Sequence, residues 1–153
     1  MKNLLLITDQ QEYSEHGTVT AFFDGFLRKH FNIQIVFLTK YKDSFQIKGD
    51  HFIVPIEYEN KIIEYLSDKN IKIDTYDMII VRNKKDILKN VLDNKVKYDY
   101  KVGYRTSYPK RFHQLELLDT SSLSGWFRSV LQKSNIRQRD TLANRCDLFL
   151  PTS

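Results

Sequence analysis

Short apolar runs alternating with segments of helical periodicity limit what this chain can fold into. The first run, Leu4–Ile7, is bounded by Thr8 and Asp9, and it is too short for a helix. Such a run is typical of a strand that is buried on both faces of a sheet. By the same reasoning the sequence predicts strands at residues 4–8, 33–38, 52–54, 78–82, 101–105 and 147–150.

Between these runs, apolar residues recur with the period of a helix. Residues 19–27 carry the first stripe, and further helices are expected over 58–69, 84–94, 110–119 and from about 123 onward. Strands that alternate with helices predict a parallel sheet with right-handed crossovers. We therefore expect one α/β domain over residues 1–153: doubly wound, mostly parallel and Rossmann-like, with helices on both faces.

In sheets of this kind ligands bind beyond the carboxyl ends of the strands. The loops that start at Asp9, Thr39, Pro55, Arg82 and Arg105 are therefore expected around one crevice. Arginine suits bidentate binding of phosphate or carboxylate. The alternative is that Arg82 and Arg105 each pair with a nearby acidic residue.

Three more candidate substrate-binding residues follow the same strands. Gly17 would let backbone N–H groups approach a phosphate, with His16 leaning into the crevice, although Gly17 could equally serve only the turn. Tyr108 could stack on a sugar face, although aromatic residues are more often core. No catalytic residue can be named.

Several familiar classes can be set aside. The loop after the first run has Gly17 alone where a dinucleotide fingerprint needs three glycines, and no P-loop sequence occurs. The histidines and the single cysteine, Cys146, have no metal-ligand spacing, so we expect no metal and no resident cofactor. No long apolar run or secretory signal is visible, which favours a cytoplasmic protein.

The net charge of +5 is unevenly distributed. Acidic and basic residues balance over residues 1–100, and the excess lies in residues 101–145, including Lys133, Arg137 and Arg139. Such an excess suggests a phosphorylated or otherwise anionic partner, among them an anionic membrane surface at the cytoplasmic face. A merely solvated helix face explains it equally well, and we do not expect nucleic acid.

The order of these segments resembles the amino-terminal domain of GT-B-fold glycosyltransferases of the glycogen-synthase-like group (the family 4 type). The resemblance rests on the stripe that starts at Thr18, on the strand at 33–39, on Tyr76–Ile80 and on the final segment Leu142–Ser153. It covers the whole chain in order. The family's usual glycine pair is His16–Gly17 here, and its histidines after two strands are replaced by Arg82 and Arg105.

That resemblance implies the acceptor-side half of a two-domain transferase that forms a glycosidic bond. Its partners would be a sugar nucleotide, bound mainly by a second domain, and a sugar or lipid-linked acceptor. The sequence given stops just after its last predicted strand, so this piece alone is expected to be inactive. The alternative function is a non-catalytic α/β module that binds a phosphorylated or anionic partner.

Overall fold

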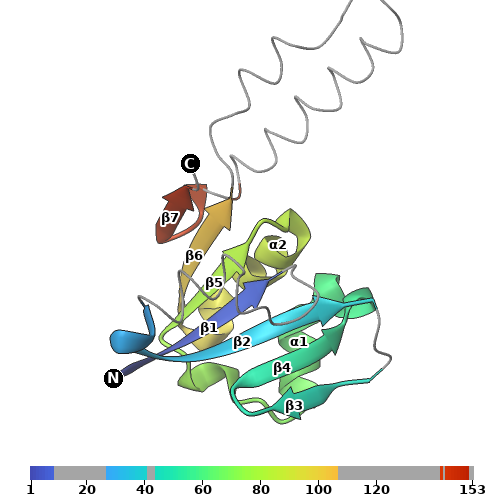
Figure 1. Ribbon diagram of the computed structural model, residues 1–153. Helices are drawn as coiled ribbons and strands as arrows, with labels where there is room; N and C mark the ends of the chain where they lie inside the picture. The colour runs from blue at the N-terminus through green and yellow to red at the C-terminus, as the bar shows by residue number, and fades with distance from the viewer. Residues whose placement is uncertain (9–26, 41–43, 107–141, 143, 152–153) are drawn as a thin grey trace, which may run out of the picture.

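The fold is organised around a central parallel sheet. The computed structural model describes residues 1–8, 27–40, 44–106, 142 and 144–151 (Figure 1). Within these ranges lies a seven-stranded sheet in the order β3-β4-β2-β1-β5-β6-β7. Its strands are β1 (Lys2–Thr8), β2 (Phe31–Thr39), β3 (Gln46–Lys48), β4 (His51–Pro55), β5 (Met78–Arg82), β6 (Lys101–Thr106) and β7 (Leu148–Pro151).

The predicted fold class is confirmed. Every pair of neighbouring strands is parallel except β3 and β4. From β1 the chain first adds β2 and β4 on one side, and it then returns to add β5, β6 and β7 on the other. This reversal makes the sheet doubly wound and is the order of a Rossmann-like fold. Each of the six predicted strands is present, with bounds shifted by a few residues.

Strand β3 is the element that the sequence did not predict. It lies in a polar stretch and pairs antiparallel with β4, with Lys48 opposite His51. Gly49 makes this hairpin possible because it adopts φ +63°, a conformation that costs glycine little. Whether such a stretch forms a strand depends on the neighbouring strand with which it pairs, since its own side chains show no periodicity.

The predicted helix over 84–94 is confirmed as α2 (Lys85–Asp93), and that over 58–69 is divided. Its first part is a 3₁₀ helix, η3 (Ile56–Lys61), and its second is α1 (Ile62–Asp68). Lys61 departs from helical geometry at the junction, with φ −132° and ψ 34°. The other short helices are η2 (Leu27–Lys29), η4 (Ile73–Thr75) and α3 (Lys95–Tyr98). The helices predicted over 19–27, 110–119 and beyond 123 lie outside the described residues, apart from Leu27, Leu142 and Asn144.

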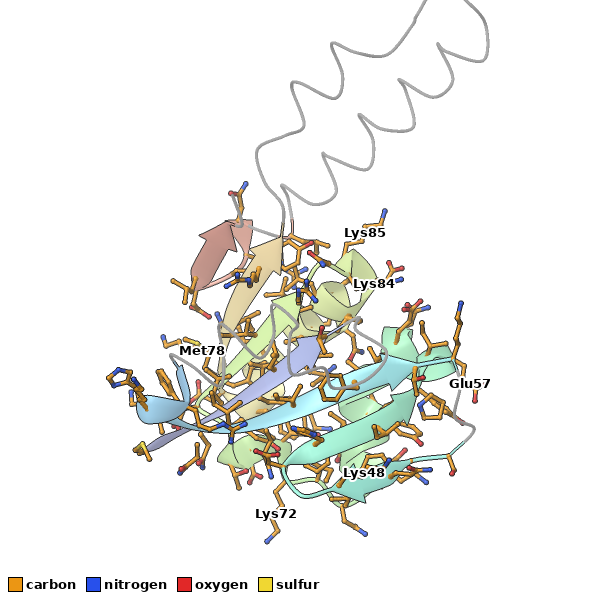
Figure 2. The ribbon with its side chains drawn as sticks, viewed as in Figure 1. Lys48, Glu57, Lys72, Met78, Lys84 and Lys85 are labelled. Carbon is orange, nitrogen blue, oxygen red and sulfur yellow. The ribbon has the colours of Figure 1, made fainter. Side chains whose placement is uncertain are left out.

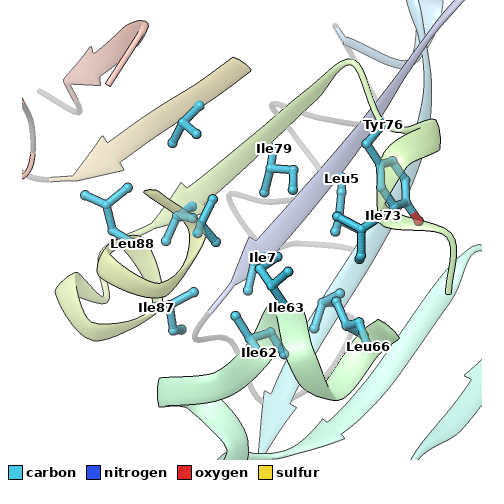
Figure 3. Packing of buried hydrophobic residues seen from close by; sticks show 14 of the residues in the cluster. Leu5, Ile7, Ile62, Ile63, Leu66, Ile73, Tyr76, Ile79, Ile87 and Leu88 are labelled. Atoms are coloured by element: carbon cyan, nitrogen blue, oxygen red, sulfur yellow. The ribbon is translucent and has the colours of Figure 1, made fainter. Parts of the chain in front are cut away.

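Alternate residues of β1, β2 and β5 face two separate clusters of buried side chains. One cluster joins the strands to α1 and α2, and we call it the helix-side cluster (Figure 3). It includes Leu5, Ile7, Ile79, Val81, Val102 and Tyr104 from the strands and Ile63, Leu66, Ile87 and Leu88 from the helices. The second cluster lies on the opposite face and consists of Leu4, Leu6, Ile33, Ile35, Phe37 and Ile80. Burial on both faces explains why these strands read as unbroken apolar runs.

Two aspartates fix the register of the strands that follow them. The Asp77 amide donates to Asn3 O at 2.9 Å, and the Asn3 amide donates to Asp77 Oδ2 at 2.8 Å. Asp147 repeats this arrangement on β6, where its amide donates to Val102 O and its Oδ2 accepts from the Val102 amide, both at 2.9 Å. Each aspartate therefore bonds the start of a new strand to the strand beside it.

Candidate functional site

The winding order places the candidate site at the carboxyl ends of β1, β5 and β6. The sheet reverses between β1 and β5, and the crevice at such a switch point is the usual ligand site of open α/β sheets. There β1 ends at Thr8 and β5 ends at Arg82, while β6 passes through Arg105 before it ends at Thr106. Two of the predicted binding residues therefore lie at the predicted place.

Arg82 and Arg105 are direct neighbours across two parallel strands. Their Cα atoms are register partners in the β5–β6 ladder, and neighbouring strands lie about 4.8 Å apart. Both side chains leave the same face, because Val81 and Tyr104, the residues before them, both point into the helix-side cluster. Both arginines are half-buried. The fold thus brings two guanidinium groups together at one edge of the sheet.

The turn after β5 holds this pair in place. Asn83 adopts φ +64°, which asparagine tolerates better than most residues. Its amide donates to Arg105 O at 2.9 Å, and its carbonyl accepts from the buried Tyr104 hydroxyl at 2.9 Å. The turn is therefore bonded to β6 at both Tyr104 and Arg105, so the two strand ends cannot separate without breaking these bonds.

The electrostatics of the pair favour an anion. Desolvation, together with the nearby charge of Arg82, lowers the pKa of Arg105 below its usual value. Like charges side by side on neighbouring strands repel each other, and a bound anion relieves that repulsion. Arginine presents a planar donor fork that matches phosphate and carboxylate groups. The geometry therefore suits a ligand that carries one of these groups.

Two lysines extend the positive charge along the same edge. Lys84 and Lys85 directly follow the turn at Asn83. Lys85 is the first residue of α2, and Lys84 is the residue before it (Figure 2). Lys84 Nζ lies 3.8 Å from Glu59 Oε2, which is within ion-pair range but too long for a hydrogen bond. That oxygen is buried and has no hydrogen-bond partner among the described residues. We therefore regard the ion pair as loose.

Two buried threonines were not among the predicted site residues. Thr8 is fully buried and Thr39 is 3 % exposed, and each is the last residue of its strand. Both lie on the Arg82 face, because Ile7 and Leu38 point into the helix-side cluster. The sequence did carry a signal for both threonines, because each is a polar residue that directly follows a buried apolar run. Thr39 had been expected only as the start of a loop.

The remaining predicted site residues, His16, Gly17 and Tyr108, lie outside the described residues, as do Lys133, Arg137 and Arg139. Within the described ranges, no group of three or more His, Cys, Asp or Glu side chains is placed to hold a metal ion. No helix in the described part of the chain is long and apolar enough to cross a membrane.

No protein-family model matches the chain, and no curated protein matches it. Among solved structures it is similar to the SurE protein from Aquifex aeolicus, with a TM-score of 0.47 and 10 % sequence identity. The similar region covers 93 % of this chain but only 60 % of that chain, so this chain spans less than two thirds of its length.

The resemblance to GT-B glycosyltransferases is wrong. A solved structure to which the chain is similar is a SurE protein, and no family or curated match supports a transferase. The prediction that the chain is part of a glycosyltransferase enzyme followed from this resemblance, and it is wrong as well. The structure shows why the motifs misled. Tyr76 is core, and Asp77 and Asp147 bond neighbouring strands, so these segments serve a parallel sheet whatever its activity.

Proposed function

We propose that this chain is an α/β module that binds a phosphorylated or otherwise anionic ligand at the carboxyl edge of its sheet. One observation carries the proposal: Arg82 and Arg105 are register neighbours on parallel strands and leave the same face at the carboxyl ends of β5 and β6, next to the switch point. Their mutual repulsion has a structural cost that an anion offsets. Lys84 and Lys85 add further positive charge beside the pair.

A phosphate group fits this pair better than a carboxylate does. A phosphate monoester carries close to two negative charges at neutral pH and offers three acceptor oxygens, so it can engage both guanidinium groups at once. A carboxylate offers two oxygens and one charge, enough for a single arginine fork. We therefore expect phosphate and pyrophosphate to bind more tightly than acetate.

The test is calorimetric titration of the chain with inorganic pyrophosphate, using the double variant Arg82→Gln/Arg105→Gln. We expect binding to weaken by about tenfold or more, which corresponds to about 1.4 kcal/mol or more. The affinity of the parent chain should also fall as salt rises, because the charges are only half-buried.

The matched control is Lys48→Gln/Lys89→Gln, which loses the same charge from two exposed positions outside the site. The control should bind like the parent. Equal weakening in both variants would mean that only overall charge attracts the anion, and it would contradict the proposed site. A parallel measurement with vesicles containing phosphatidylserine distinguishes a soluble phosphate ligand from a lipid headgroup.

A further inference from the structure

A second candidate site lies at the opposite edge of the sheet. An open hollow of about 510 Å³ is bordered by the end of α1, by η4 and by α3. Its lining residues are Ser67, Asn70, Ile71, Lys72, Ile73, Asp74, Lys97 and Tyr98. Lys72 is at the end of the molecule away from Lys84 and Lys85 (Figure 2). The volume is within the range of small-molecule sites.

The walls of this hollow are fixed by the fold. Helix α1 ends in a turn in which Asn70 takes φ +66° and the Ile71 amide donates to Leu66 O at 3.0 Å. On the other side, Tyr98 stacks on Tyr100 with ring centroids 6.4 Å apart and an interplanar angle of 15°. Because both sides are tied to buried residues, a ligand would meet a surface that is already formed.

The charges in the hollow select for a single negative charge. Lys72 and Lys97 are exposed, and within the described ranges neither has an opposite charge at ion-pair distance. Lys97 Nζ instead lies 5.1 Å from the centroid of the Tyr98 ring, where the electron-rich face attracts it. Asp74 is the one carboxylate among the lining residues, and it opposes a dianion.

The apolar part of the lining comes from Ile71, Ile73 and Tyr98. Ile73 is 1 % exposed, whereas Ile71 and Tyr98 are half-buried and keep apolar surface that a ligand can contact. We propose that this hollow binds a small aromatic monocarboxylate. Its carboxylate would contact Lys72 and Lys97, and its ring would lie against Ile71 and Tyr98. Flat rings pack favourably against such aromatic and aliphatic surfaces.

The probe is benzoate, with neutral benzamide and inorganic phosphate as comparisons. NMR mapping of amide chemical shifts should show benzoate perturbing Ser67–Asp74 and Lys97–Tyr98. We expect weak binding, about millimolar, because the lysines are exposed. Benzamide should bind more weakly, since it lacks the charge, and phosphate should leave these amides unshifted while it perturbs the Arg82 edge.

The deciding variant is Lys72→Gln/Lys97→Gln, with Lys48→Gln/Lys89→Gln as the equally charged control. The first should weaken benzoate binding by roughly tenfold, and the control should leave it unchanged. Equal binding of benzamide, equal binding of phosphate in the hollow, or unchanged binding by the first variant would each overturn the proposal. The two sites have separate probes and separate amides, so either proposal can fail without the other.

Discussion

The side-chain amide of Asn90 joins the two helices that cover one face of the sheet, through its contact with Glu64. Asn90 Nδ2 donates to Glu64 Oε2 at 2.9 Å, and Asn90 Oδ1 accepts from the Ile63 amide at 2.9 Å. Among the described residues, Asn90 is one of three buried polar residues. It thereby satisfies a backbone donor in the first turn of α1 that has no partner within its own helix.

Replacing Asn90 with alanine should destabilise the fold. The substitution leaves the buried Ile63 amide without an acceptor, and such a loss costs about 1–3 kcal/mol. Urea unfolding followed by circular dichroism measures the change. The exposed Asn60 gives a control, since its substitution by alanine should leave the unfolding midpoint within error. Equal stability of the Asn90 variant and the parent would show that water satisfies the amide equally well.

Glu64 should make the free energy of unfolding depend on pH below pH 4.5, the ordinary pKa of a glutamate side chain. Burial alone would raise its pKa, but hydrogen bonds from Asn90 and Asn94 and the charge of Lys61 lower it below 4.5. A carboxylate with a depressed folded pKa stabilises the fold above pH 4.5, and its contribution disappears as the pH falls through the folded value. Glu64→Gln should therefore flatten the acid side of a plot of unfolding free energy against pH. If the curve of the variant ran parallel to that of the parent, Glu64 would not have this role.

Asp147 should determine whether β7 stays paired with β6. Its Oδ2 accepts from the Val102 amide at 2.9 Å and lies 2.6 Å from Lys95 Nζ. Asp147→Ala removes both contacts, so hydrogen exchange at the Val102 amide should accelerate by about tenfold or more. The exposed Asp68 gives a control, because its change to alanine should leave Val102 protected. Unchanged exchange in the Asp147 variant would contradict the role of this aspartate.

Gly103 should resist enlargement because β6 passes close to a β5 side chain. A Cβ atom added at Gly103 would lie 3.1 Å from Ile80 Cγ1. Ile80 is 1 % exposed and has little room to move, so Gly103→Ala should cost about 1–3 kcal/mol of unfolding free energy. Ile80→Ala removes Cγ1, so the double variant Gly103→Ala/Ile80→Ala should lose less unfolding free energy than the two single variants lose together. A stable single variant would show that Ile80 adjusts freely.

The parallel sheet was predictable from the sequence because burial on both faces leaves a pattern in it. Leu4–Ile7 and Met78–Val81 are unbroken apolar runs, and Ile87, Leu88, Val91 and Leu92 repeat with the period of α2. The positions of Arg82 and Arg105 followed as well, since each is the last residue of a predicted strand. Strand β3 left no such pattern, because its existence depends on the edge of β4.

The sequence by itself determined the fold class, the central strands and the strand ends on which the two arginines sit. It did not reveal that Arg82 and Arg105 are neighbours, because residues 23 positions apart meet only through the pairing of β5 with β6. It also did not reveal the hollow beside Lys72 and Lys97, whose walls come from three separate segments. Local pattern records whether a side chain is buried, whereas only tertiary packing decides which side chains share a surface.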